Sequence, residues 1–297
     1  MTQLLSTSVI GAGPMGRALA RRLSERGTPV TVWNRTRAAA DKLAEFGIAV
    51  ADTPAGAFNA SEMTIVCVAN HAAALEVVRN ALGSGASFDG RLIIEMSSST
   101  PDEARRLYAE NVAHGAEALD ANILCFPEHI GSSEALFVVA GPRAAWERGQ
   151  RTLRELADCR YAGQDPGAAR VVAKTAASVY FTSHSAFAEA FAAAIALGAD
   201  PETVLHASLV MNRLAGEGMR MTAEEFSSDR SVDVEVRMAT RVEDAKVGYE
   251  TIRSGGMPGM MIGAARELMA KAVEAGRGDE EMTALVEVLL ASRAGGG

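Results

Sequence analysis

Short apolar runs alternate with segments of helical periodicity in the first half of the chain. The apolar runs cover residues 8–10, 30–33, 65–69, 92–96 and 136–140. The segments between them have the spacing of amphipathic helices, with apolar residues three and four positions apart. Strands that alternate with helices are typical of a parallel sheet covered by helices, so we predict an α/β fold for this part.

The pattern changes where residues 163–167 read Gly-Gln-Asp-Pro-Gly. Residues 168–197 contain neither Gly nor Pro, and they predict one helix of about 30 residues, roughly 45 Å long. Because this helix is apolar almost all round, we expect it to be buried on most sides, in part by a second copy of the chain. The remainder is predicted to be helical. The domains are therefore 1–162, with the sheet, and 163–297, with the long helix and a helical dimerisation domain.

The first predicted strand runs into a glycine turn at the start of a helix, where residues 11–16 read GAGPMG. Within a strand-helix-strand unit, G-x-G-x-x-G binds a dinucleotide. The first Gly permits the tight turn, the second lets the backbone approach a pyrophosphate, and the third lets the helix pack on the strand. Free N–H groups at the helix start hold the phosphates. The predicted cofactor residues here are Gly11, Gly13, Pro14, Met15 and Gly16.

The end of the second predicted strand indicates which dinucleotide binds. An NAD site usually has Asp or Glu there, bonded to the ribose 2′-hydroxyl. This chain has Asn34, Arg35, Thr36 and Arg37 instead. No carboxylate is present to repel a 2′-phosphate, and two guanidiniums with a hydroxyl can bind one. We therefore predict NADPH at these four residues, and the alternative is that both arginines only face solvent.

Two further loops follow predicted strands. Val68, Ala69 and Asn70 end one strand, while Ser97 and Ser98 follow the next. Ligands of open α/β sheets bind outside the carboxyl ends of the strands. We predict these five residues at the cofactor site as well.

Composition narrows the possible partners. The chain has 297 residues, of which 48% are hydrophobic and 22% charged, as in ordinary globular proteins. A net charge of -8 without a long basic run argues against nucleic acid. The three cysteines lie outside any C-x-x-C motif, which indicates reduced thiols in the cytoplasm. No uninterrupted apolar stretch of about 18 residues predicts a membrane span, and no His, Cys, Asp and Glu spacing predicts a metal site.

Five segments spread along the chain match the motifs of one known family, and one of them is the C-terminal turn 275–279. The other four are the glycine motif with Val32-Trp33-Asn34-Arg35-Thr36, the loop 97–101, the segment 119–124, and Gly163, Asp165, Gly167 and Ala169. On these segments the chain resembles the imine reductases and reductive aminases, relatives of the β-hydroxyacid dehydrogenases. The resemblance implies an N-terminal Rossmann domain, a long interdomain helix and an all-helical C-terminal domain. It also implies a domain-swapped homodimer with active sites between subunits.

The same resemblance implies a substrate site for an imine, or for a carbonyl compound and an amine. Asn122, Ile123 and Leu124 match the family's active-site segment. Asn122 would contact substrate or the nicotinamide carboxamide, while Ile123 and Leu124 form a hydrophobic wall or only pack the sheet. Counting from Gly163 puts the family's usual acid position at Ala173, which can neither donate nor accept a proton.

Two substitutes for that acid stay open. Helix geometry places positions 173, 177, 180 and 184 along one face. Tyr180 is therefore the first candidate and His184 the second, unless both are core or interface residues. Alternatively, Lys174 is the catalytic lysine of a β-hydroxyacid dehydrogenase, displaced by one residue or about 100° of helix rotation.

The missing acid also bears on the reaction. A preformed iminium needs no acid before hydride arrives, whereas a ketone needs one worth about 10²–10⁴-fold in rate. Ala173 therefore favours an NADPH-dependent reduction of C=N bonds. The alternatives are a β-hydroxyacid dehydrogenase that uses Lys174 and an NADP-binding protein without catalysis.

Overall fold

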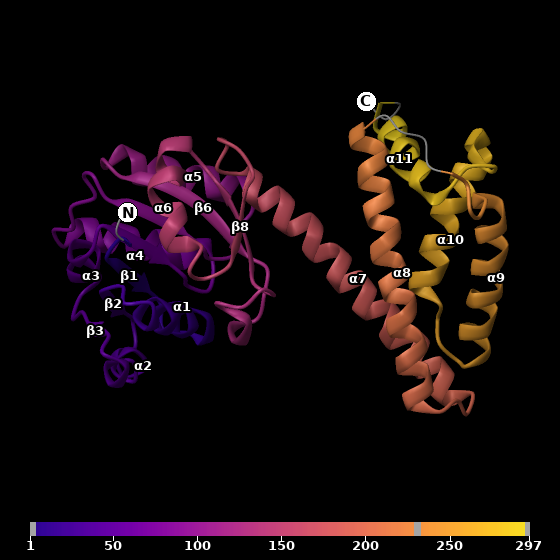
Figure 1. Ribbon diagram of the computed structural model, residues 1–297, viewed down its shortest axis with the longest axis horizontal. Helices are drawn as coiled ribbons and strands as arrows, with labels where there is room; N and C mark the ends of the chain where they lie inside the picture. Colours follow the sequence, from indigo (N-terminus) through magenta and orange to yellow (C-terminus); the bar gives the residue numbers. More distant parts are fainter. Residues whose placement is uncertain (1–3, 229–232, 295–297) are drawn as a thin grey trace. The chain divides into compact units, whose positions relative to one another are not determined.

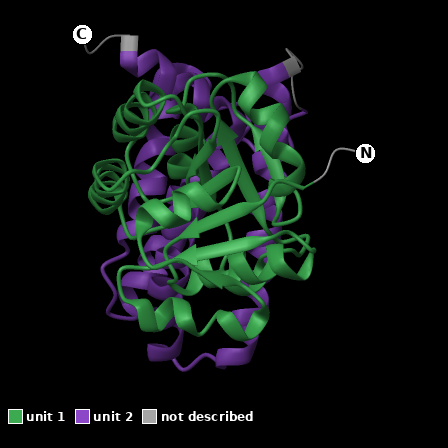
Figure 2. Ribbon diagram, turned by 90° about the vertical axis from the view of Figure 1, so that its left-hand side faces the viewer, with its two compact units in different colours: residues 1–177 green, residues 178–297 purple. Residues whose placement is uncertain are grey.

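The chain folds into two compact units, Met1–Ala177 and Ser178–Gly297 (Figures 1 and 2). The computed structural model describes residues 4–228 and 233–294. The units meet inside helix α7 (Ala168–Ala196), whose first turns pack against the sheet of the first unit. The division into domains at 162/163 stays a prediction.

The first unit is built around an eight-stranded sheet in the order β3-β2-β1-β4-β5-β6-β7-β8. The predicted α/β fold is confirmed. The strands are β1 (Thr7–Ile10), β2 (Val30–Trp33), β3 (Ala49–Val50), β4 (Met63–Val66), β5 (Leu92–Glu95), β6 (Glu117–Ile123), β7 (Leu136–Ala140) and β8 (Asp158–Tyr161). Strands β1 to β6 are all parallel to one another.

Strand β7 departs from the predicted parallel arrangement, because it runs antiparallel to β6 and parallel to β8. A parallel neighbour needs a long crossover, usually a helix. Between β6 and β7 the chain forms only the 3₁₀ turn η2 (Pro127–His129), so it returns beside β6 in the opposite direction. A helix does join β7 to β8, and that pair is parallel.

Helices cover both faces of the sheet (Figure 1). They are α1 (Pro14–Glu25), α2 (Arg37–Asp41), α3 (Pro54–Ala60), α4 (His71–Gly83), α5 (Pro101–Ala113) and α6 (Arg143–Leu153), with the 3₁₀ turn η1 (Ala44–Phe46). Leu19 of α1 and Trp146 of α6 belong to one buried cluster. Phe58 of α3, Val78 of α4 and Leu107 of α5 belong to the other. The sheet is therefore buried on both sides, as expected for parallel strands.

Helix α7 confirms the predicted long helix, with 29 residues. The expectation that it is buried on most sides is not met within one chain. Val172, Val179 and Phe181 are 45%, 43% and 63% exposed. The apolar surface of this helix is therefore available to another molecule.

The second unit is helical, as predicted. After α7 it contains α8 (Pro201–Ser228), α9 (Met238–Ser254), α10 (Met260–Ala272), η3 (Val273–Arg277), η4 (Met282–Ala284) and α11 (Leu285–Ala294). Glu189 of α7 accepts hydrogen bonds from the N–H groups of Met260 and Met261, at 2.9 and 3.1 Å, so it caps the start of α10. Among the helices of the described residues, none is both long and apolar enough to cross a bilayer.

Candidate active site

The glycine turn joins β1 to α1 with very little space. Gly11 has φ +111°, and a Cβ on it would collide with the carbonyl oxygen of Cys67. A Cβ on Gly16 would collide with the carbonyl oxygen of Gly11. A Cβ on Gly13 would meet nothing within 4 Å. The outer two glycines are thus required by packing, and the middle one borders open space where a ligand can approach the backbone.

A cavity of about 740 Å³ opens over this turn. It lies between β1 and β4, where the strand order reverses and where ligands of such sheets bind. It brings together ten of the predicted cofactor residues: Gly11, Gly13, Pro14, Met15, Gly16, Asn34, Arg35, Thr36, Val68 and Ala69. Helix α4 supplies part of the opposite wall with Glu76 and Asn80.

Asn34 holds the glycine turn in place. Its Oδ1 accepts a hydrogen bond from the N–H of Ala12 at 2.9 Å, and its Nδ2 donates to the carbonyl of Thr36 at 2.9 Å. The side chain therefore ties the turn to the loop after β2, which carries the two predicted arginines.

The structure separates those two arginines. Arg35 is exposed and lines the cavity. Arg37 does not line it, and its guanidinium pairs with Asp52 and, at 3.3 Å, with Asp41. The hydrogen bond that Arg37 donates to Asp52 raises the pKa of Arg37. Arg37 therefore already has two carboxylate partners, whereas Arg35 is among the residues that line the cavity.

The remaining predicted cofactor residues form the loops beside the cavity rather than its lining. The Oγ of Ser97 accepts from the N–H of Val68 at 3.0 Å, and the carbonyl of Ser98 accepts from the N–H of His71 at 3.0 Å. The Oδ1 of Asn70 caps α4 by accepting from the N–H of Ala73 at 3.0 Å. The loop after β5 is thus fixed against the end of β4, which does line the cavity.

A cluster of buried polar and charged side chains lies at the carboxyl ends of β5 and β6, and the sequence alone did not predict it. We call it the Arg170 cluster; it comprises Glu95, Ser97, Asp120, Asn122 and Arg170, each at most 5% exposed. The Arg170 Nε lies 2.8 Å from Asp120 Oδ2, and its Nη2 lies 2.6 Å from Oδ1. Its Nη1 donates to Asn122 Oδ1 at 3.2 Å and to the carbonyl of Ser97. Arg170 therefore attaches the first turn of α7 to two strands.

The cluster holds two carboxyl groups for one guanidinium. Glu95 and Asp120 are paired across β5 and β6, so their side chains leave the sheet on the same face. Burial raises the pKa of Glu95 to about 7 and the pKa of Asp120 to about 6, although Arg170 lowers both. The Oε2 of Glu95 is buried and has no hydrogen-bond partner among the described residues.

The three predicted substrate residues lie at the end of β6, and their side chains point to both sides of the sheet. Asn122 faces Arg170, and Leu124 packs in the cluster of Val138, Ala140 and Ala169 below α7. Ile123 packs in the core on the other face. Ile123 and Leu124 therefore do not form one wall, because successive strand residues point to opposite sides.

Ala173 lies one turn beyond Arg170 and is 3% exposed. Residues three positions apart share a helix face, so Ala173 faces the same way as Arg170, towards the strand ends. Lys174 follows Ala173 on α7, about 100° further round the helix.

The two predicted donors lie further along α7. The rings of Tyr180 and His184 are stacked, with centroids 6.3 Å apart, so the structure brings them together. Tyr180 is 54% exposed. Their roles stay predictions.

The family model of the NAD-binding domain of 6-phosphogluconate dehydrogenase matches residues 6–163. The chain belongs to this family. The chain is 29% identical to an NADPH-dependent reductive aminase of Aspergillus oryzae over 287 residues, which cover 94% of this chain and 95% of that protein. The match confirms the predicted Rossmann domain.

Solved structures of similar fold align with nearly the whole of this chain. An imine reductase from Pseudomonas sp. has a TM-score of 0.86 and 26% identity, over 97% of this chain and all (100%) of that one. A reductive aminase from Aspergillus terreus, in complex with NADPH and ethyl levulinate, shares the fold with a TM-score of 0.85 and 24% identity over the same shares of the chains. The predicted resemblance to imine reductases and reductive aminases is confirmed by these relatives.

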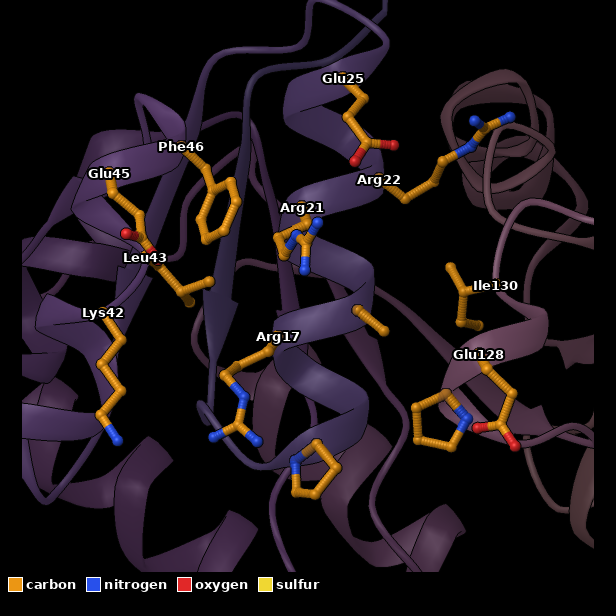
Figure 3. A pocket seen from close by; sticks show the side chains of 13 residues that line it. Arg17, Arg21, Arg22, Glu25, Lys42, Leu43, Glu45, Phe46, Glu128 and Ile130 are labelled. Atoms are coloured by element: carbon orange, nitrogen blue, oxygen red, sulfur yellow. The ribbon is translucent and has the colours of Figure 1, made fainter.

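A second cavity of this chain lies on the outer side of α1 and has a volume of about 620 Å³ (Figure 3). Its walls mix Arg17, Arg21 and Lys42 with Glu25 and Glu45. The Arg21 guanidinium lies over the Phe46 ring, 4.2 Å from its centroid. Of the predicted site residues only Pro14 borders it, and charges of both signs line it, so we place the cofactor in the larger cavity.

Two signals in the sequence could have revealed the Arg170 cluster. Glu95 ends a strand that is otherwise apolar, and Arg170 stands among Ala and Val at the start of an apolar helix. Charged residues are rarely fully buried unless they are paired. Within the described residues, no group of three His, Cys, Asp and Glu side chains could hold a metal ion.

Proposed function

We propose that the protein is an NADPH-dependent reductase of C=N bonds, which converts imines or iminium ions to amines. One observation carries the proposal: a dinucleotide cavity with Arg35 and Thr36 in place of an acidic residue, in a chain whose relatives of nearly equal length are reductive aminases and imine reductases. A carbonyl compound and an amine are the corresponding substrates where the imine forms beforehand.

The cavity fits NADPH. The open space over Gly13 and the N–H groups at the start of α1 suit the pyrophosphate. Arg35 and Thr36 suit the ribose 2′-phosphate, and the loops of 68–70 and 97–98 suit the nicotinamide half. When bound, NADPH supplies a hydride.

The residues at the strand ends define the substrate side. Asn122 is fixed by Arg170 and by Asp120, whose Oδ2 lies 3.3 Å from its Nδ2. A C=N bond that arrives as an iminium needs no acid at position 173, whereas a ketone would. We assign Tyr180 an orienting role for the substrate, with His184 stacked against it.

A homodimer completes the site in this proposal. Apolar side chains are exposed along α7 and α8, including Phe181 at 63%, Leu209 at 60% and Met211 at 63%. Exposed apolar side chains in such number are typical of an interface with another molecule. A second chain that covers α7 would enclose Tyr180 and exclude water from the substrate. The three unpaired cysteines fit a reducing, cytoplasmic location.

A β-hydroxyacid dehydrogenase is the second candidate. The observation in its favour is Lys174, an ammonium one position after Ala173 on α7. An ammonium there could serve the proton transfer that a hydroxyl group requires.

A single set of assays tests the proposal. The protein and NADPH are incubated with 1-pyrroline or 3,4-dihydroisoquinoline, and the protein and NADP⁺ with a panel of β-hydroxyacids. Amine formation supports the proposal. Hydroxyacid oxidation that is abolished in Lys174→Ala supports the second candidate, and NADPH binding without any turnover would contradict both. Tyr180→Phe should raise the KM for the imine several-fold more than it lowers kcat.

A further inference from the structure

One residue that lines the cofactor cavity carries a charge that does not suit phosphate groups. Among the described residues of the lining, Glu76 of α4 is the one carboxylate. The residue is exposed, and no arginine or lysine of the described chain forms an ion pair with it. Like charges repel, so the Glu76 carboxylate must lie away from the phosphates of NADPH and beside a group that donates a hydrogen bond.

Glu76 belongs to one face of α4 that forms a long wall of the cavity. The lining residues of this wall recur at the three- and four-residue spacing of one helix face. They are Ala73, Glu76, Val77, Asn80 and the C-cap residue Ser84. From position 73 to position 84 the wall extends about 16 Å, which is longer than a nucleoside.

The neighbours of this wall belong to the adenosine side of the cavity. Pro54 also lines the cavity, and it begins α3, which follows β3, the strand beside β2. Phe58 of α3 and Val78 of α4 lie in the same buried cluster, so the two helices pack side by side. The wall of α4 therefore continues to the part of the cavity that lies beyond the end of β2.

The covalent structure of NADPH brings its adenine to this part. The 2′-phosphate suits Arg35 and Thr36, and the base is bonded to the ribose carbon next to the one that carries this phosphate. Adenine must therefore lie within one sugar of the loop after β2. The nicotinamide half extends in the other direction across Gly13, towards the loops of 68–70 and 97–98.

Adenine also offers the group that a carboxylate needs. Beyond the ribose, the adenosine half has one hydrogen-bond donor, the amino group on C6, while its ring nitrogens are acceptors. A carboxylate accepts a hydrogen bond from such an exocyclic amino group, and an amide can donate to a ring nitrogen. Glu76 and Asn80 supply these two groups on one wall, and Ala73 and Val77 supply apolar surface for the face of the ring.

We propose that Glu76 is a specificity-determining residue that selects adenine as the base of the cofactor. Its carboxylate accepts a hydrogen bond from the C6 amino group, and the Asn80 amide donates to a ring nitrogen. The inference rests on the proposed position of NADPH in this cavity. A base with a carbonyl group on C6 would put an oxygen against the carboxylate with no hydrogen between them, so it binds more weakly.

The test compares NADP⁺ with its hypoxanthine analogue, which has a carbonyl group in place of the C6 amino group and the same sugars, phosphates and nicotinamide. Titration calorimetry gives the dissociation constants for wild type and for Glu76→Gln. Wild type should bind NADP⁺ about tenfold more tightly than the analogue, as expected for a hydrogen bond to a charged group. In Glu76→Gln the new amide can donate to the carbonyl group, so the ratio should fall to about one.

The ratio of the two constants separates recognition of the base from general electrostatics. Removing a negative charge from the cavity favours both dinucleotides, because both carry the same phosphates, and this gain cancels in the ratio. The matched control is Glu45→Gln, since Glu45 is also exposed but lines the cavity on the outer side of α1. It should keep the ratio of the wild type.

Each outcome decides one claim. A ratio that falls in Glu76→Gln alone supports the inference, and it does so even if no imine is reduced. A wild type that binds both dinucleotides equally, or a Glu76→Gln variant that keeps the ratio of the wild type, overturns the inference and leaves the proposed function intact. If wild type binds neither dinucleotide, the proposed NADPH-dependent function fails and the inference falls with it.

Discussion

At the scale of single residues, we propose that Arg35 decides the choice of cofactor. Arg35 lines the cavity, while Arg37 beside it is neutralised by Asp41 and Asp52. An arginine that already pairs with carboxylates contributes less binding free energy towards a phosphate than an arginine without such partners. The sequence shows both arginines at equivalent positions, so only the structure distinguishes them.

We therefore expect Arg35→Ala to raise the KM for NADPH at least about tenfold, equivalent to about 1.4 kcal/mol, with little change for NADH. Arg37→Ala should raise it by less than about threefold. Initial rates with both cofactors measure this. A larger effect of Arg37→Ala would place the 2′-phosphate on α2 instead.

Glu95 should also make stability depend on pH. Its ordinary pKa of 4.5 rises to about 7 in the folded chain, so the folded state binds the proton more tightly. The stability it contributes is fully present below pH 4.5 and is lost as the pH rises through about 7, a change of about 3 kcal/mol. Urea unfolding at several pH values should show Glu95→Gln gaining on wild type across that window. A constant difference between the two proteins would contradict the raised pKa.

At the scale of elements, the Arg170 cluster joins α7 to the sheet. Arg170→Leu leaves Asp120 buried without its partner, so we expect a loss of about 3–5 kcal/mol in the free energy of unfolding. The double variant Arg170→Leu with Asp120→Asn should recover part of the loss, since no unpaired charge remains. The matched control is Arg148→Leu, which breaks the exposed pair with Glu117 and should cost less than about 1 kcal/mol. Equal losses of unfolding free energy in Arg148→Leu and Arg170→Leu would show that the buried pair stabilises the chain no more than the exposed pair.

The sequence was sufficient for elements whose signal is local. Gly11 and Gly16 predict a turn that the structure fills completely, and the run without Gly or Pro from 168 predicts α7 almost to its last residue. The direction of β7 was missed, because the pattern 136–140 is the same for parallel and antiparallel strands. The Arg170 cluster was missed for a related reason: its members come from three distant segments, and pairing between them is a tertiary property.

At the scale of the molecule, the exposed apolar face of α7 and α8 predicts a concentration-dependent assembly. Leu209→Glu puts a charge on α8 at a side chain that is 60% exposed, so it should not disturb the isolated chain. We expect wild type to sediment as a dimer and Leu209→Glu as a monomer that still binds NADPH but has lost most imine turnover. Thr203→Glu, near the start of α8, is a control for added charge. A fully active monomer would contradict a site completed by the second chain.

The most direct test of the central claim follows the hydride itself. NADPH that carries deuterium on the transferred position of C4 is incubated with the protein and 1-pyrroline, and the product is analysed by mass spectrometry. We expect pyrrolidine with one deuterium on the carbon beside nitrogen and one equivalent of NADP⁺. Cofactor that stays reduced while no pyrrolidine forms would contradict the reduction of C=N bonds by this protein.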